Sequence, residues 1–301
     1  MLENFNEFKE VFNARAVECS LTRVSVVNVG GEDVAIVWDK LEYEARIEAR
    51  SQIIRNLSDI SQVIFPYDLN NPNLSYDLES YFSGNAARAL GYMLLEGKSG
   101  QVTLNLPYLM GANVIVSVED EQATMSITPK FRRVYDTALN ERLVMMDGIG
   151  FLVSDSYDPT YRTVKNIEGR YESKRAIYNS IMKNNDMSRY LSAGLILAED
   201  TAGVGALFSI SYIYNQNDRC LTSFDSDMAA LSLALVYRGH CQDCVVKQKN
   251  GSSIKVNISS DTMSVSGSVS VVYDGSMFFQ GIEFGRKNRW GNLNREIFPA
   301  P

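Results

Sequence analysis

Four side chains that can bind zinc occur near one another in the second half of the sequence: Cys220, His240, Cys241 and Cys244. Zinc takes four nitrogen or sulfur ligands, and two cysteines separated by two residues are the usual half of such a site. The other half is not compact here. His240 is adjacent to Cys241, so on a strand their side chains would point to opposite faces. We weigh a zinc site against ordinary, partly buried thiols, and we favour the thiols.

The other patterns that could carry chemistry are incomplete. Gly203-Val204-Gly205 has the start of a dinucleotide-binding loop, but Phe208 occupies the position of the third glycine. Asp225 and Asp227 could hold a divalent cation, but a helix cap is the simpler explanation and the one that we favour. The chain has one histidine, which leaves little room for histidine-dependent catalysis. We therefore predict no catalytic residues, no cofactor and no metal, and we predict that the protein is not an enzyme.

Two basic regions are candidates for an interaction surface. The region 158–190 contains Arg170, Lys174 and Arg175 with interleaved tyrosines, and phosphate contacts use such cations while exposed aromatic rings stack on bases. The same region also fits a solvated helix face. The C-terminal tail carries Arg286 and Arg289 around Trp290. It fits either nucleic acid or an arm that pairs with an acidic neighbour.

Hydrophobic periodicity predicts several helices. Apolar residues recur at helical spacing, interrupted by turn-forming residues, and Gly97 and Gly239 follow two of the segments as C-terminal caps. The predicted helices cover Met1–Ala16, Leu41–Ile60, Tyr76–Glu96, approximately Glu168–Lys183 and Asp227–Tyr237. The small residues Gly84, Ala86 and Ala87 would let another element approach the third of these helices closely.

Period-two alternation and turn signals predict antiparallel hairpins. Gly30-Gly31 separates two strands rich in β-branched residues, and further strands are expected at 101–106, 112–118, 123–128, 142–155 and 206–214. The best-marked group is a four-stranded meander over Asp243–Phe284, with turns at Asn250-Gly251, Ser260-Asp261 and Asp274-Gly275. Gly267 inside one of its strands indicates a bulge or a close approach by another backbone segment.

Composition places the chain among ordinary globular proteins. It has 301 residues, 45% of them hydrophobic, and a net charge of -7, which argues against a generally nucleic-acid-binding surface but allows a local basic patch. No apolar run reaches the ~20 residues of a transmembrane helix, and the N-terminus lacks the pattern of a signal peptide. We expect a location in the cytoplasm or in a virion, with reduced cysteines.

These observations predict an α+β fold in which hairpins and the C-terminal meander pack with several α-helices. We predict a single domain over residues 1–301, with a division into two lobes near 154–160 as the alternative. We recognise no family. The sequence shows no set of catalytic residues, but it predicts many hairpins and an arm at each end of the chain. We therefore predict a structural subunit of a large assembly, such as a viral capsid, virion clamp or phage tail component. Its partners would be copies of itself and other subunits. The alternative is a nucleic-acid-binding module that uses residues 158–190.

Overall fold

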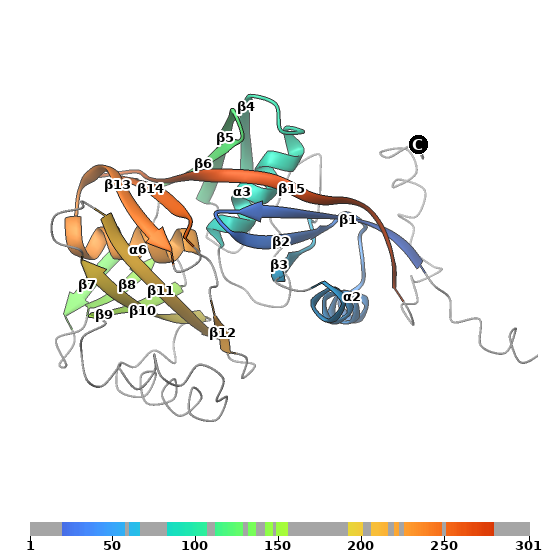
Figure 1. The fold of residues 1–301 in the computed structure, drawn as a ribbon, viewed down its shortest axis with the longest axis horizontal. Coiled ribbons are helices and arrows are strands. Elements are labelled where there is room, and N and C mark those ends of the chain that lie inside the picture. Colours follow the sequence, from blue (N-terminus) through green and yellow to red (C-terminus); the bar gives the residue numbers. More distant parts are fainter. Residues whose placement is uncertain are drawn as a thin grey trace, which may run out of the picture.

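The protein is mostly β-sheet. The computed structural model describes residues 20–57, 60–66, 83–106, 112–128, 132–136, 142–146, 149–155, 192–200, 206–215, 220–222, 226–248 and 251–279. Within this part of the chain there are fifteen strands and three helices (Figure 1). The prediction of an α+β fold with several helices is therefore wrong. Hydrophobic periodicity in the sequence is a local signal that indicates single helices. It does not show how many strands surround each helix in the folded chain.

The described elements between Ser20 and Ile127 are six strands and two helices. The strands are β1 (Ser20–Val29), β2 (Glu32–Val37), β3 (Ile60–Ile64), β4 (Gly100–Leu106), β5 (Ala112–Glu119) and β6 (Gln122–Ile127), and the helices are α2 (Tyr43–Asn56) and α3 (Gly84–Leu94).

The described part of the chain from Arg132 onward contributes nine strands and one helix. The strands are β7 (Arg132–Asp136), β8 (Arg142–Met146), β9 (Ile149–Asp155), β10 (Ser192–Asp200), β11 (Ala206–Asn215), β12 (Cys220–Thr222), β13 (Cys241–Gln248), β14 (Ser253–Ile258) and β15 (Met263–Phe279), and the helix is α6 (Ser226–Arg238).

Two helices form the centres around which the strands are arranged. Helix α3 contacts β1, β2, β4, β5 and β6, whereas α6 contacts β8 to β11, β13 and β14 (Figure 1). The strand order is β3-β2-β1-β15-β14-β13-β11-β10-β9-β8-β7, and β6, β5 and β4 branch from β15. Strand β15 contacts both central helices and runs between the two groups of strands.

The sequences of the central helices suit burial on all sides. Every residue from Gly84 to Gly91 in α3 is buried, and so is every residue from Ser226 to Ala234 in α6. A helix that is apolar around its whole circumference belongs inside a protein. Gly91 is required by this packing, because a Cβ atom there would lie 2.5 Å from the Cβ of Val116 in β5.

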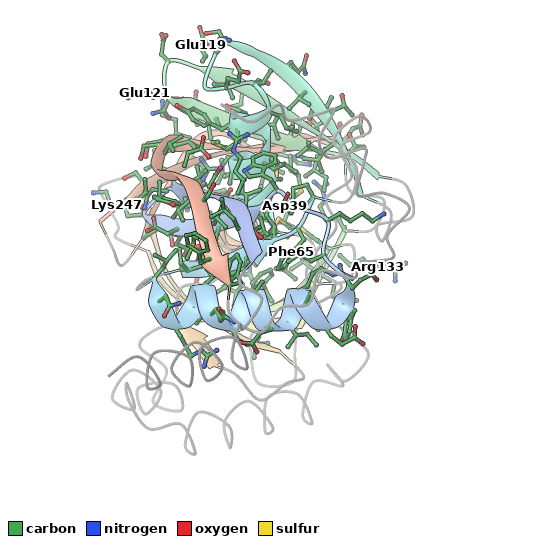
Figure 2. The ribbon with its side chains drawn as sticks, turned by 90° about the vertical axis from the view of Figure 1, so that its right-hand side faces the viewer. Asp39, Phe65, Glu119, Glu121, Arg133 and Lys247 are labelled. Carbon is green, nitrogen blue, oxygen red and sulfur yellow. The ribbon has the colours of Figure 1, made fainter. Side chains whose placement is uncertain are left out.

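Helix α2 lies on the outside and buries only one side. Its Ala49 and Ile53 pack against Val24 and Phe279 in a second apolar cluster, which also includes Phe65. Figure 2 shows this helix running across the molecule below Phe65, while Glu119 and Glu121 lie at the outer end of the β5–β6 hairpin. The sequence predicts a helix over Leu41–Ile60, and the structure confirms its central part.

The predicted four-stranded meander is a three-stranded one. Strands β13, β14 and β15 pair in antiparallel order, and the predicted turn at Asp274-Gly275 lies inside β15. The reason is long-range: Asp274 binds Arg23 and Ser25 of β1, and Gly275 pairs with Val24. These partners hold the chain extended through a dipeptide that would otherwise favour a turn.

Other boundaries follow local chemistry. The Gly30-Gly31 hairpin is confirmed, with φ angles of 60° and 88° that glycine adopts readily. The start of the third predicted helix is wrong, because Ser83 is extended and caps α3, which begins at Gly84 and not at Tyr76. The expected strands at 101–106, 112–118, 123–128 and 206–214 are present.

Some expectations fall on residues that are not described. These are the helices over Met1–Ala16 and Glu168–Lys183 and most of the division near 154–160, which stays a prediction. In the part of the chain that the structure describes, no helix combines the length and the apolar character needed to span a bilayer.

Replacing Gly91 with Ala tests the tight packing around α3. We expect the added methyl group to destabilise the fold by about 1–3 kcal/mol, because overpacking in a filled core exceeds the gain in helix propensity. Urea unfolding would measure it. In the double variant Gly91→Ala/Val116→Ala the collision is removed, so its loss should be smaller than the sum of the single losses. Simple additivity would contradict this packing.

Candidate active site

The N-terminal ends of the two central helices meet in the middle of the molecule. A Cβ atom at Gly84, the first residue of α3, would lie 2.6 Å from the Cβ of Asp227, the second residue of α6. Only a glycine allows this approach, and Gly84 is one of the small residues predicted to let another element come close. The first turn of a helix has N–H groups without partners inside the helix, so this meeting point concentrates hydrogen-bond donors.

A buried ion pair joins the two helices. Arg88 of α3 donates from Nε to Asp227 Oδ2 at 2.7 Å and from Nη2 to Oδ1 at 2.6 Å, and both side chains are 0% exposed. This two-point geometry fixes the orientation of both groups. In a dry interior the attraction between the charges is strong, while either charge alone would be costly.

The surroundings of Arg88 leave no spare volume. A Cβ atom at Gly267 of β15 would lie 2.9 Å from Arg88 Nη1, and one at Gly30 would lie 3.5 Å from Nη2. The same Nη1 lies 3.4 Å from the carbonyl oxygen of Ala123 in β6, which accepts its hydrogen bond. The sequence predicts a bulge or a close backbone approach at Gly267, whereas the group that approaches it is the guanidinium of Arg88.

Asn85 connects a third element, the start of β2, to both helices. Its side-chain amide donates to the carboxylate of Glu32 and, at 3.2 Å, to Ser226 Oγ. Its Oδ1 accepts from the main-chain N–H of Asp227 at 3.2 Å. The Glu32 carboxylate also accepts from the N–H of Ser226 at 3.5 Å, so it lies at the N-terminus of α6. Glu32 is 4% exposed and Asn85 is fully buried.

A second branch of the network leads to β3. Ser83 caps α3 by accepting the N–H of Ala86 at 3.2 Å, and its hydroxyl donates to Gln62 Oε1 at 2.7 Å. Ser83 and Gln62 are both buried. Hydroxyl groups thus stand at the start of each central helix, Ser83 for α3 and Ser226 for α6.

This arrangement has the components of a site for moving a proton on an anionic compound. Helix N-termini favour negative charge through their N–H groups and dipoles. The Glu32 carboxylate can accept and return a proton, whereas Asp227 is held as a fixed anion by Arg88. The segments that lead into the two helices, 67–82 and 223–225, lie outside the described residues.

The residues singled out from the sequence are not part of this cluster. Arg170, Lys174, Arg175, Arg286, Arg289 and Trp290 all lie outside the described residues, and they stay predictions. Cys241 and Cys244 lie on β13, with His240 directly before it. Cys244 is buried, whereas His240 and Cys241 border an open groove of about 610 Å³. Among the described residues, no group of three His, Cys, Asp or Glu side chains is placed to hold a metal ion.

Sequence reasoning missed Glu32, Asn85 and Arg88, and it treated Asp227 as a cap or cation ligand. One signal was present. Arg88 is the single charged residue in the apolar run from Ala86 to Met93, and a charge in a buried helix requires a partner. Nothing local indicates that its partner is 139 residues further along the chain.

Comparison with solved structures identifies the fold. The structure of a hydroxyproline epimerase from Agrobacterium vitis, with bound trans-4-hydroxy-L-proline, is similar over 88% of this chain and 93% of that chain, with a TM-score of 0.59 and 11% identity. A probable proline racemase from Agrobacterium radiobacter K84, with bound carbonate, is similar over 90% and 95% (TM-score 0.55, 11% identity). A phenazine biosynthesis protein of the PhzC/PhzF type from Clostridium difficile strain 630 is similar over 85% and 99% (TM-score 0.54, 11% identity).

These likenesses show a fold of the PhzF and proline racemase type. No protein-family model matches the sequence, and no curated protein matches it. The fold contradicts three predictions: a structural subunit of a capsid, virion clamp or tail, its nucleic-acid-binding alternative, and the absence of enzymatic activity. The expected location in a virion depended on the assembly prediction, so it is now unsupported. The error arose because the absence of a sequence motif was taken as the absence of a catalytic site. The polar groups of this site come from four separate elements, β2, β3, α3 and α6, so no short motif contains them.

Removing one partner of the buried ion pair should be costly. We expect Arg88→Met or Asp227→Leu alone to destabilise the fold by about 3–5 kcal/mol, because each leaves the other charge buried without its counterion. Denaturant unfolding would measure the loss. The double variant Arg88→Met/Asp227→Leu leaves no charge behind, so it should be more stable than either single variant. If the double variant loses as much as both singles together, the pair does not act as described.

Burial should also make Cys244 a poor nucleophile. Desolvation, with Cys241 close by, raises the pKa of the Cys244 thiol from 9.0 to about 11, so at pH 8 the neutral thiol dominates. Alkylation follows the thiolate fraction, and we expect it to be about 100-fold slower in the folded than in the urea-unfolded chain. Peptide mapping after iodoacetamide treatment measures the rate, which should rise with pH towards 11. Equal rates in the two states would contradict the burial.

Proposed function

We propose that the protein is an isomerase or epimerase that moves a proton at a carbon atom next to the carboxyl group of a small organic acid. The observation that carries the proposal is the meeting of two buried helix N-termini around the Glu32 carboxylate. The fold supports it, because similar structures include a hydroxyproline epimerase and a probable proline racemase. We choose a small organic acid as the substrate because helix N-termini favour an anion, and because the similar epimerase binds trans-4-hydroxy-L-proline.

The chemistry follows from the charges. Removal of a proton next to a carboxyl group places negative charge on the carboxyl oxygens in the transition state. Fixed donors that point at this charge stabilise it most effectively when water is excluded. The N-terminal ends of α3 and α6 meet here, and the positive ends of their dipoles favour such negative charge.

Glu32 is the side chain that we assign to proton transfer. It lies beside Asn85 and the N–H of Ser226, so its position is fixed relative to both helices. A positioned carboxylate acting as general base and then as general acid contributes typically about 10²–10⁴-fold to a rate. Asn85 is assigned to positioning, since its amide group contacts Glu32, Ser226 and Asp227 together.

The Arg88–Asp227 pair has a different role in this proposal. Both of its groups are fully buried and occupied by each other, so the pair holds the two helix N-termini at a constant separation. Catalytic groups that belong to separate elements need such support, because small displacements of reacting groups reduce rates strongly.

Hydrogen exchange in D₂O tests the proposal directly. The purified chain would be incubated with D- and L-proline, trans-4-hydroxy-L-proline and a panel of other chiral and β,γ-unsaturated acids. Proton NMR would follow loss of the signal next to the carboxyl group, and chiral chromatography would follow inversion. We expect exchange with at least one acid, and a loss of at least ~100-fold in Glu32→Gln.

Lys98→Gln is the matched control, because Lys98 lies on the surface beyond the C-terminal end of α3, where it forms an ion pair with the exposed Glu96. Its activity should equal that of the wild type. Two results would count against the proposal: a folded wild-type chain that exchanges no acid of the panel, or a folded Glu32→Gln variant with full activity.

A further inference from the structure

Strand β13 begins with two cysteines that the proposed function does not use, Cys241 and Cys244. A regular strand would keep these residues apart. Three steps along such a strand separate the Cα atoms by roughly 10 Å, and an odd number of steps directs the two side chains to opposite faces. A disulfide needs Cα atoms about 4.4–6.8 Å apart, so regular strand geometry would exclude one here.

A β-bulge removes this obstacle. Cys241 lies opposite Ile258 of β14 and Cys244 lies opposite Val256, and the register of the two strands shifts between the cysteines. Three steps along β13 therefore cover the same length as two steps along β14, which is about 6.6 Å. This separation falls within the range that a disulfide can bridge.

The bulge is held in place by the neighbouring strand. Asp243 has a φ angle of 51°, in the left-handed region that residues other than glycine seldom enter. Its N–H donates to Asn257 Oδ1 of β14 at 2.7 Å. Asp243 and Gln242 are both exposed, so the two residues between the cysteines face solvent. The irregular backbone is thus a defined feature of the fold.

The bulge also brings the two thiols to the same face of β13. Cys244 belongs to the larger core cluster, and Cys241 packs against that cluster. Cys241 Sγ lies 3.9 Å from the carbonyl oxygen of Val256, the residue opposite Cys244. Burial, and after it the charge and the hydrogen bond of the Cys241 sulfur, raises the pKa of the Cys244 thiol. The two sulfur atoms are therefore neighbours.

The two thiols differ in their access to solvent. Cys244 is buried, whereas Cys241 is half-buried and borders the open groove of about 610 Å³, together with polar residues such as Asn257 and Thr262. Sites for small molecules commonly have volumes of about 300–1,000 Å³. A small reagent can thus reach Cys241 first. An accessible thiol beside a second thiol that can react with it is the usual arrangement of redox-active cysteines.

We propose that Cys241 and Cys244 form a reversible disulfide by exchange with a low-molecular-weight disulfide of the glutathione class. The Cys241 thiolate attacks one sulfur of the small disulfide, and one small thiolate leaves. The Cys244 thiol then loses its proton and attacks Cys241 Sγ, and the second small thiolate leaves. The protein loses two electrons and the small disulfide gains them. The two protons from the protein thiols end on the two small thiols.

The proposed disulfide does not depend on the proposed function. The cysteines follow the C-terminal end of α6, whereas Glu32 and Asp227 lie at its N-terminal end. The 13 residues of this helix separate the two places by about 20 Å. Serine variants of the cysteines should therefore leave proton exchange unchanged. Glu32→Gln should leave the disulfide unchanged, so the two proposals fail separately.

Thiol trapping tests the disulfide. The background variant Cys19→Ser/Cys220→Ser removes the other two thiols of the chain. The folded chain would be incubated with glutathione disulfide, quenched with acid, unfolded, alkylated with iodoacetamide and mapped by mass spectrometry. We expect the peptide that contains both cysteines to lose two hydrogen atoms, to retain no glutathione and to resist alkylation. Dithiothreitol should reverse the change completely.

Two single variants in the same background are matched controls for each other, since each keeps one thiol. Cys244→Ser should stop at a mixed disulfide between Cys241 and glutathione, because the thiol that closes the ring is absent. Cys241→Ser should react with glutathione disulfide at least ~10-fold more slowly than Cys244→Ser, because its remaining thiol is buried and mostly protonated. Urea unfolding would establish that both variants are folded.

The stability of the oxidised chain gives a second readout that needs no substitution in the pair. The folded chain already holds the two thiols together, so we expect the oxidised form to unfold at a higher urea concentration than the reduced form. Three results would overturn the proposal. The folded chain could form no disulfide at any concentration of glutathione disulfide, or it could retain glutathione on Cys241 although Cys244 is present. Unfolding of the oxidised form at a lower urea concentration would show that the bulge does not suit the bond.

Discussion

The buried ion pair between Arg88 and Asp227 is the interaction on which the rest of the structure depends. It joins the two helices around which most of the described strands are arranged, and both of its side chains are fully buried. A guanidinium in such a place requires a counterion, a carbonyl and space, and each comes from a different part of the chain: α6, β6, and the glycines of β15 and the β1–β2 turn. A side chain at Gly267 would collide with it, because a Cβ atom there would lie 2.9 Å from Arg88 Nη1.

Holding the helix N-termini together has an electrostatic consequence. Two positive dipole ends meet in one place, which would be unfavourable without nearby negative charge. Asp227 and Glu32 supply that charge, one fixed by an arginine and one beside the amide of Asn85. The close meeting of the two helix N-termini thus places the Glu32 carboxylate beside them. The positive dipole ends at the same place can stabilise a further anion.

The sequence contained the local features but not their arrangement. Glycine turns and period-two alternation predicted the β1–β2 hairpin and most strands, because both signals depend on neighbouring residues. Helix boundaries were less accurate, since the capping of α3 by Ser83 competes with apolar periodicity that begins earlier. Asp274-Gly275 favours a turn in isolation, but pairing with β1 keeps it extended. The site was beyond prediction, because Glu32, Asn85, Arg88 and Asp227 come from three elements and only the folded chain brings them together.

The pairing of β1 with β15 also affects how the protein is made. Arg23 and Asp274 are separated by 251 positions, so β1 emerges from the ribosome long before its longest partner exists. At about 5–20 residues per second, the interval is roughly 12–50 s. During that time the apolar residues of β1 that later face β15 and α2 have only local partners. The apolar cluster formed by β1, α2 and the end of β15 is therefore completed late in synthesis. Until then, β1 remains available to chaperones.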